Sequence, residues 1–478
     1  MGQGAYILLI NNTISDLVKK GENSYQMAHW NWPDLIHKNE AKKVYVEYSE
    51  NIFKTVSDDG GNVYYYSTDE KLSLDLSSNS IGIGKYNISF TFASTEIANT
   101  KVDLGWNHDG IMPIVIYDNK KGSYAAVTNT HKESRKISSD EKLETIKYIG
   151  LPGIAWRSDN WMTDNIGILG KKPISKITMP GTHDSGMYCF DHKKSTKFAV
   201  TDTTITQECD IYQQLKLGAR FFDFRVMINE GGYYLCHGSH IGKLGWQGAV
   251  GPSIDLVIED ISRFTSEGHN ELIIIKCSND VNADKGFNRF SPEEWGDLYK
   301  KFNQLNHLKN TDEKKSELEP NLFNETLGKL TDSGKNPAII LLLEKHDDGN
   351  LSSCNFKKRF PIFDNYSDKD DFDLMSKDQI KKMKDYGSSS EAYRGSGFTA
   401  SWTLTQSAFD AIVLTIDESL DRFISSIKRL AKSANDNLDI LHNEITHSSH
   451  PNIILIDCLN LEYSVAVMAT TNMCNDFE

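Results

Sequence analysis

The chain has 478 residues, a length that favours two domains, each large enough to bury a sizeable apolar core. Apolar residues make up 39% of the sequence and charged residues 25%, which is the composition of a globular protein. No apolar run approaches the roughly 18 residues that a membrane-spanning helix needs. The net charge of −14 argues against broad binding to nucleic acid and against purely electrostatic attachment to anionic membranes.

The N-terminal residues MGQGAYILLI lack the charged region and the cleavage site of a signal peptide. We therefore expect a cytoplasmic protein, or one exported by a non-classical route. The seven cysteines include no CxxC pair, which predicts neither a disulfide framework nor a zinc site.

Residues 1–150 are predicted to form a small all-β, sandwich-like domain. Short segments rich in β-branched and aromatic residues are separated there by Gly, Asn and Asp turns. These segments are KVYVEYSE, GNVYYYSTDE, KYNISFTFAST, GIMPIVIYDN and GSYAAVTNTH. A polar, charged stretch follows and predicts a domain boundary near residues 145–155.

Residues 151–478 are predicted to form an α/β barrel, because compact apolar strands now alternate with helical stretches. The strand segments are ISKITMPG, ARFFDFRV, YYLCHG, ELIIIKCS, AIILLLE, FTASWTL and NIILIDCL. A crossover helix is expected before ELIIIKCS, with its buried face formed by Ile254, Leu256, Val257, Ile258 and Ile261. The polar stretches 280–335 and 345–395 are expected at the barrel rim.

Polar side chains gather at the ends of the first three predicted barrel strands. The segment ITMPGTHDSGMY presents His183 and Asp184 directly after an apolar strand. In ARFFDFRV, Asp223 and Arg225 share the face opposite the two flanking phenylalanines. The segment YYLCHG ends near His237. Barrels place catalytic groups at the carboxyl ends of their strands, so we expect these side chains to converge.

Two imidazoles and a guanidinium are suited to a metal-free transfer at a phosphodiester. One His removes a proton from the attacking oxygen and the other protonates the leaving oxygen, because the reference pKa of His lies near 6.5. Arg225 is then expected to neutralise the nonbridging phosphate oxygens.

These motifs, in this order, resemble the X-box catalytic barrel of bacterial phosphatidylinositol-specific phospholipases C. The resemblance covers residues 158–460, about two-thirds of the chain. It implies a TIM barrel of the phospholipase C type. It also implies cleavage of phosphatidylinositol, or of a glycosylphosphatidylinositol (GPI) anchor, to diacylglycerol and inositol 1,2-cyclic phosphate at a membrane surface that the protein binds peripherally.

The same resemblance implies roles for individual catalytic residues. His183 is the general base for the inositol 2-hydroxyl, and Asp457 orients its imidazole. His237 is the general acid, assisted by Asp184, and Arg225 binds the phosphate.

Three further residues are implied in substrate binding: Lys276 in the charged wall of the site, Asp364 on the inositol hydroxyls, and Tyr366 stacked on the inositol ring. Arg225 stands where calcium-using relatives have a cation ligand, and Asp184 stands where they have Asn. We therefore expect no metal and no other cofactor. Asp223 either belongs to the site or only pairs with Arg225.

Two alternative readings remain at this point. A metal-dependent sphingomyelinase D or glycerophosphodiesterase uses a similar barrel with two histidines, but it needs clustered carboxylates. The other alternative is a lipid- or glycan-binding module with an accessory barrel, in which the aromatic side chains of the β domain form the contact patch. Tyr64, Tyr65, Tyr66 and Trp106 are the candidates, although ordinary core packing is the preferred reading for them. For the β domain we hypothesise a role in targeting the barrel to membranes.

Overall fold

The computed structural model describes most of the chain, in twelve segments. These are residues 3–49, 60–82, 85–119, 123–131, 144–149, 157–197, 199–309, 318–344, 359–386, 396–407, 426–446 and 448–473. Part of the predicted rim stretch 345–395 lies outside them. None of the described helices is long and apolar enough to cross a membrane.

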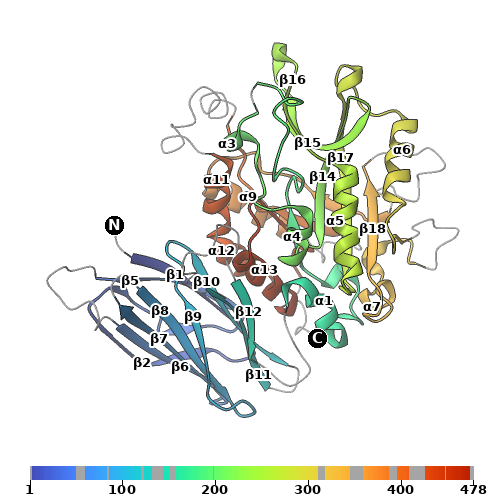
Figure 1. The fold of residues 1–478 in the computed structure, drawn as a ribbon. Helices are drawn as coiled ribbons and strands as arrows, with labels where there is room; N and C mark the ends of the chain where they lie inside the picture. The colour runs from blue at the N-terminus through green and yellow to red at the C-terminus, as the bar shows by residue number, and fades with distance from the viewer. Residues whose placement is uncertain are drawn as a thin grey trace. The chain divides into compact units, whose positions relative to one another are not determined.

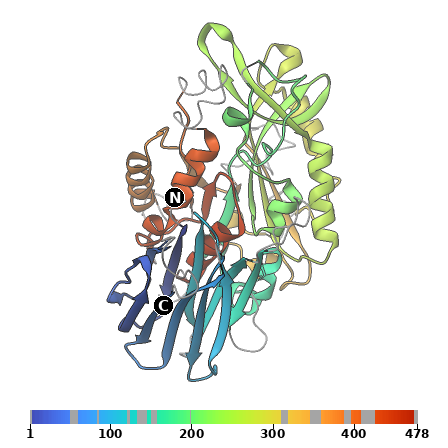
Figure 2. The same cartoon turned by 60° about the vertical axis from the view of Figure 1, so that its left-hand side comes forward.

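The chain divides into two compact units. The first contains residues 1–158 together with 438–445 and 461–478, and the second contains residues 159–437 and 446–460. The predicted single boundary near residue 150 therefore differs from the structure at the C-terminal end, where two segments belong with the N-terminal strands. Figures 1 and 2 show the course of the chain in both units.

The first unit is a β-sandwich. One sheet has the strand order β12-β11-β10-β1-β5-β3 and the other has the order β4-β2-β6-β7-β8-β9. The strands of the first sheet are β1 (Gln3–Asn12), β3 (Met27–Trp30), β5 (Glu40–Tyr48), β10 (Ile111–Asn119), β11 (Ser123–His131) and β12 (Glu144–Ile149). Those of the second are β2 (Leu17–Tyr25), β4 (Leu35–Ile36), β6 (Gly60–Ser67), β7 (Leu72–Gly82), β8 (Lys85–Ser94) and β9 (Thr100–Gly105).

Alternate residues of both sheets fill the space between them, as the period of two in a strand requires. Val63 and Tyr65 of β6, Leu74 of β7 and Phe90 of β8 all belong to this core and are at most 1% exposed. Trp106 is partly buried and packs against the same core. The core reading is therefore correct for Tyr65 and Trp106.

Two C-terminal helices, α12 (Leu438–His442) and α13 (Leu461–Met473), complete the first unit. Helix α13 contacts β10, β11 and β1, and α12 contacts β5. The side chain of Asn12 donates to the carbonyl of Ala469 at 2.7 Å, and the backbone N–H of Ala41 donates to Asn443 at 2.7 Å. The outward side chains of β1 and β10 include Leu8, Ile10, Val115 and Tyr117, which are buried, and this explains why that part of the sheet needs a cover.

The second unit contains a nine-stranded sheet whose main path is β16-β15-β14-β13-β21-β20-β19, with β17 paired to β14 and β18 paired to β17. All pairings are parallel except those of the hairpin formed by β15 and β16. The strands are β13 (Met179–Thr182), β14 (Phe221–Asn229), β15 (Gly232–His240), β16 (Trp246–Ser253), β17 (Leu272–Asn282), β18 (Ala338–Leu343), β19 (Ile362–Asp364), β20 (Gly397–Ser401) and β21 (Ile453–Ile456).

Helices connect and cover these strands. They are α1 (Trp161–Asp164), α2 (Ile166–Leu169), α3 (Thr201–Thr204), α4 (Ile211–Lys216), α5 (Ile254–Ser266), α6 (Pro292–Phe302), α7 (Leu327–Leu330), α9 (Phe372–Tyr386) and α11 (Ile427–Asn435). Helix α5 is the predicted crossover before β17. Its buried face differs from the prediction at Leu256, which is 42% exposed because the helical period carries it to the solvent side.

A closed TIM barrel is not confirmed. Strands β18 and β19 end the parallel array, and no pairing joins them within the described part of the chain. The predicted third barrel strand also differs from the structure, because β15 turns back antiparallel on β14 instead of continuing the parallel order. The structure supports a mixed α/β unit with an open, partly barrel-like sheet.

Candidate active site

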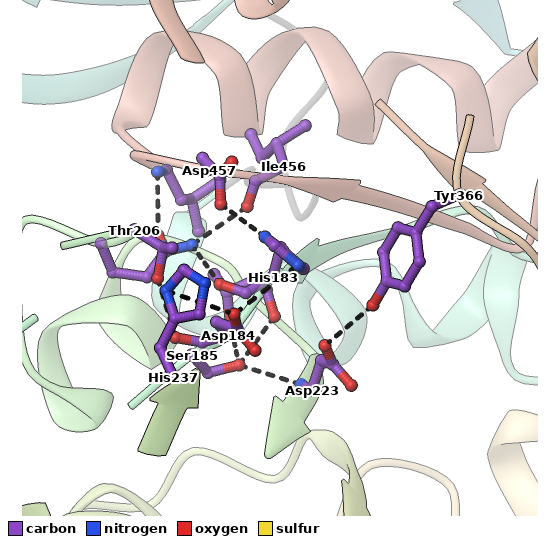
Figure 3. A network of polar contacts seen from close by, with 12 residues as sticks. His183, Asp184, Ser185, Thr206, Asp223, His237, Tyr366, Ile456 and Asp457 are labelled. Carbon is purple, nitrogen blue, oxygen red and sulfur yellow. Dashed lines mark hydrogen bonds and ion pairs between the residues drawn. The ribbon is translucent and has the colours of Figure 1, made fainter. Parts of the chain in front are cut away.

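The first and last strand ends of the parallel array bring His183 and Asp457 together. Strands β13 and β21 pair in parallel, and the backbone N–H of His183 continues the ladder by donating to Ile456 at 3.0 Å. His183, which follows β13, and Asp457, which follows β21, therefore project from the same edge of the sheet. His183 Nδ1 lies 2.8 Å from Asp457 Oδ1, and the two side chains are only 13% and 4% exposed. Figure 3 shows this pair, with Asp184 and Asp223 below it in the view.

The electrostatic surroundings of His183 favour its charged form. Burial lowers the pKa of the imidazole, but the carboxylates of Asp457 and Asp184 outweigh burial and raise the pKa to about 9. His183 Nε2 also lies 3.0 Å from Arg225 Nη2. Because a guanidinium can only donate, this hydrogen bond needs a neutral imidazole with its proton on Nδ1. Protonation of His183 must therefore be accompanied by movement of Arg225 away from Nε2.

Asp184 holds the centre of the site. It adopts a left-handed backbone conformation (φ 40°), directly after the strand end, and its side chain is fully buried. Its Oδ1 forms an ion pair with Nε of Arg225. Its Oδ2 lies 3.8 Å from His183 Nε2 and also 3.8 Å from His237 Nδ1. One carboxylate thus stands between two imidazoles and a guanidinium.

His237 projects from β15, and its side chain is 25% exposed. Its Nδ1 lies 3.3 Å from the carbonyl of Thr204, which can accept a proton held on Nδ1. Burial lowers the pKa of His237, and the positive charge of Arg225 lowers it further. Asp184 raises this pKa but does not outweigh them. The two imidazoles therefore have opposite tendencies, with His183 charged and His237 neutral near pH 7.

A second set of charges lines the site beside Arg225. Lys276 Nζ lies 2.6 Å from Asp364 Oδ2 and 3.7 Å from Asp223 Oδ1. Burial lowers the pKa of Lys276, but Asp364 and Asp223 outweigh it and raise the pKa above the usual range. Burial raises the pKa of Asp223, but Lys276 and Arg225 outweigh it and lower the pKa. Asp223 therefore pairs with Lys276 as well as lying near Arg225.

Tyr366 joins the two sets. Its hydroxyl lies 3.4 Å from Arg225 Nη2 and 3.5 Å from Asp223 Oδ2, and its ring meets the His183 ring edge to face with centroids 5.5 Å apart. All of the predicted catalytic and substrate-binding side chains therefore lie in one continuous network of contacts.

A cluster of His183, Asp184 and Asp223 offers ligand atoms that all lie within 4.8 Å of one another, as a metal site would require. The chemistry of its surroundings fits a divalent cation poorly. Arg225 already pairs with Asp184, and Lys276 lies beside Asp223, so a dication would meet two fixed positive charges. His183 would also have to lose the proton that its raised pKa favours, because a metal binds only the neutral ring.

Several supporting residues were missed by sequence reasoning. Gln207 is 1% exposed, and its Nε2 donates to the carbonyls of His183 at 2.9 Å and Ile456 at 3.0 Å. Its Oε1 accepts from the backbone N–H of Leu459 at 3.1 Å. Gln207 thus ties together the two loops that carry His183 and Asp457. It lies in a polar segment without a strand pattern, so the sequence offers no signal for this role.

Thr206, Ser185 and Asn435 hold the same loops. Thr206 Oγ1 donates to the carbonyl of Asp184 at 2.9 Å, and Asn435 Nδ2 donates to the carbonyl of Asp457 at 2.7 Å. Ser185 Oγ accepts from the backbone N–H of Asp223 at 2.9 Å, which links the first strand end to β14. Figure 3 shows Thr206 and Ser185 near Asp184. The sheet edge that carries His183 and Asp457 is therefore fixed mainly through backbone carbonyls and N–H groups.

Comparison with known proteins finds sequence relatives that are named as PI-PLC X-box proteins or as phosphatidylinositol phosphodiesterases. No family model matches the chain. A PI-PLC X-box domain-containing protein of Dictyostelium discoideum is 30% identical over 141 residues, covering 27% of this chain and 18% of that protein. The 1-phosphatidylinositol phosphodiesterase of Staphylococcus aureus strain Newman is 27% identical over 149 residues, covering 30% of this chain and 40% of the relative. The matched parts thus span less than half the length of these relatives.

Similar solved structures are the phosphatidylinositol-specific phospholipases C of Staphylococcus aureus, as a variant, and of Listeria monocytogenes. The first is 15% identical and covers 69% of this chain and 100% of that one, with a TM-score of 0.46. The second is 17% identical and covers 66% and 98%, with a TM-score of 0.43. The sequence relatives confirm the resemblance to phosphatidylinositol-specific phospholipases C of the X-box type that the motifs predict.

Proposed function

We propose that the second unit cleaves phosphatidylinositol, or a GPI anchor, to diacylglycerol and inositol 1,2-cyclic phosphate without a metal or other cofactor. The observation that carries the proposal is the position of Asp184 Oδ2, 3.8 Å from an imidazole nitrogen of His183 and of His237. Two imidazoles on either side of a carboxylate–guanidinium pair can remove one proton and deliver another across the same phosphorus atom.

In the proposed reaction, His183 Nε2 takes the proton of the inositol 2-hydroxyl as that oxygen bonds to phosphorus. The bond from phosphorus to the diacylglycerol oxygen breaks, and this oxygen takes a proton from His237. Arg225 neutralises the nonbridging oxygens, where a planar guanidinium is most effective. Asp457 stabilises the imidazolium that forms at His183, at the 2.8 Å contact with Nδ1.

The substrate head group has partners in the rest of the network. The Asp364 carboxylate, 8% exposed and paired with Lys276, is proposed to accept hydrogen bonds from the inositol hydroxyls. Tyr366 is proposed to stack on the inositol ring. Binding by Tyr366 and Arg225 requires the 3.4 Å contact between them to give way to contacts with substrate.

The protonation states of the free site set a further requirement. His183 has the raised pKa and His237 the lowered one, whereas the reaction needs a neutral His183 and a charged His237. In both arrangements the pair of imidazoles carries one positive charge, so the two forms have the same total protonation. The active form, with the charge on His237, is the less populated of the two. We expect a bell-shaped pH profile of kcat/KM, with its alkaline limb near the His183 pKa of about 9.

A metal-dependent phosphodiesterase, such as a sphingomyelinase D or a glycerophosphodiesterase, is the second candidate function. The cluster of His183, Asp184 and Asp223 is the observation that favours it. The positive charges of Arg225 and Lys276 beside the two carboxylates oppose it. Chelation of divalent cations separates the two candidates.

The test is phosphorus NMR of the full chain with phosphatidylinositol vesicles in EDTA. We expect a cyclic inositol phosphate resonance that disappears in His183→Ala and in His237→Ala. His240→Ala is the matched control, because His240 lies on the same strand as His237 and is exposed. Turnover that appears only with added calcium or magnesium would establish the metal-dependent candidate instead. No turnover under either condition would leave the binding-module reading.

A further inference from the structure

The two sheets of the β-sandwich have outer faces of opposite character. The outer face of the first sheet is mainly apolar on β1, β10 and β11, which contact α13. No described helix of the first unit covers the second sheet, which Figure 1 shows as the layer of β2, β6, β7, β8 and β9. Its outward side chains, in contrast, are mainly polar and include two tyrosines. An uncovered sheet face is ordinary in antiparallel sheets.

Tyr64 and Tyr66 are the aromatic residues at the centre of this face. They alternate with the core residues Val63 and Tyr65 on β6 and are 37% and 43% exposed. The β6 strand lies between β2 and β7, so both rings stand in the interior of the sheet face and not at its edge. Residues two apart on a strand are about 6.6 Å apart, so the two rings can contact neighbouring units of one extended ligand.

Hydrogen-bonding groups surround the two rings in register. The strand pairings place Gly21, Tyr64, Asp75, Thr91 and Lys101 in one row across β2, β6, β7, β8 and β9. Gly21 leaves room beside the ring, since a Cβ there would lie 3.6 Å from Tyr64 Cδ2. Asp75 is partly exposed, and its Oδ1 atom, which is itself buried, has no hydrogen-bond partner among the described residues.

The adjacent rows continue this chemistry. One row joins Val18, Tyr66, Ser73 and Ala93, and the other joins Asn23, Asn62, Ser77 and Ser89. Ser89 is buried, and its hydroxyl lies 2.8 Å from that of Ser77. Amide and hydroxyl groups therefore predominate, and the row of Tyr64 carries one acid and one base. A face without excess positive charge does not suit an anionic lipid surface or a nucleic acid. Sugars present apolar C–H faces for rings and hydroxyls for amides, hydroxyls and carboxylates.

We propose that this face of the second sheet binds a neutral carbohydrate chain. Tyr64 and Tyr66 stack against successive sugar rings, and Asp75 accepts from sugar hydroxyls beside them. The aromatic rings supply contact area at little cost in side-chain entropy, because each has only two rotatable torsions. The site lies outside the proposed catalytic network, so the proposal stands or falls independently of the phospholipase activity.

The test is native gel electrophoresis of the full chain in gels that contain a soluble neutral polysaccharide, with mannan, galactomannan and mixed-linkage β-glucan as separate probes. We expect retardation by at least one probe. Retardation should be lost in Tyr64→Ala and Tyr66→Ala, with affinity for the corresponding hexasaccharide weakened about tenfold or more in each. Tyr64→Phe and Tyr66→Phe retain the ring and should retain most of the binding. Ile14→Ala is the control, because Ile14 is 61% exposed and precedes β2.

Three outcomes would overturn the proposal. One is the absence of retardation by every probe, and another is retardation that both alanine variants preserve. The third is binding to phosphatidylcholine or phosphatidylinositol vesicles that requires Tyr64 and Tyr66 in the absence of carbohydrate binding, which would identify a membrane contact. Unchanged thermal unfolding and unchanged hydrolysis of phosphatidylinositol in the variants would show that the fold and the second unit are intact.

Discussion

Replacement of Asp457 by Asn tests the electrostatic account of His183 most directly. The rise of the His183 pKa from 6.5 to about 9 corresponds to roughly 3 kcal/mol in favour of the charged ring. Burial opposes this rise, so the attraction from the carboxylates is larger than the net effect. Without the Asp457 charge at 2.8 Å, burial and Arg225 are opposed by Asp184 alone. We expect the His183 pKa of Asp457→Asn to fall by about 2 or more.

The assay is NMR titration of histidine labelled at Cε1, with His183→Ala to assign the resonance. Stability should follow the same pKa, since protonated His183 stabilises the wild type below pH 6.5 and this contribution is lost as the pH rises through about 9. Asp457→Asn should lack that slope. Its kcat should fall about 10³- to 10⁴-fold, as when the orienting carboxylate of a catalytic His is replaced by an amide. A His183 titration midpoint that stays near 9 in Asp457→Asn would refute the reasoning. Asp436→Asn is the control, because Asp436 pairs with Lys432.

Three further substitutions test the support of the site. Arg220 and Glu271 form an ion pair at 2.7 Å, and both side chains are fully buried. Arg220→Met leaves the Glu271 carboxylate without this cation. Denaturant titrations should show a free energy of unfolding lower by about 3–5 kcal/mol. Lys276→Met leaves the carboxylates of Asp223 and Asp364 without their cation. Lys276 lowers the pKa of Asp223, so denaturant titrations should show a loss of stability at pH 7 that becomes smaller as the pH falls and Asp223 is protonated. Gln207→Leu removes three hydrogen bonds to the catalytic loops, and steady-state kinetics should show kcat reduced with KM little changed.

The residues of the network could be predicted because they lie at strand ends or on the inward face of strands. Parallel strands bring their carboxyl ends to one edge, so His183 after β13 and Asp457 after β21 had to meet once those strands paired. The alternation of β14 likewise placed Asp223 and Arg225 on one side. Their distances could not be predicted, and neither could the contact between Arg225 and His183, which depends on side-chain torsions.

Other features depend on contacts that no local pattern carries. Gln207 acts through three backbone groups that are distant in sequence. Helix α13 belongs with strands more than three hundred residues earlier, and nothing in its apolar composition says which sheet it covers. The period of two could have separated Tyr65 from Tyr64 and Tyr66 before the structure was known, because only every second residue of a strand faces the core.

Arg225 links phosphate binding to base catalysis in the proposed mechanism. In the form of the site with a neutral His183, Nη2 donates to His183 Nε2 at 3.0 Å, and Nε2 is the atom that must take the proton of the inositol hydroxyl. A phosphate that draws Nη2 away would free Nε2 at the moment when the hydroxyl arrives, while Nε stays paired with Asp184. The same phosphate adds negative charge near both imidazoles and favours protonation of His237, whose pKa burial holds low in the free site. In that form Arg225 occupies the base until a phosphate draws Nη2 away, and His237 is protonated less readily until that phosphate adds negative charge beside it.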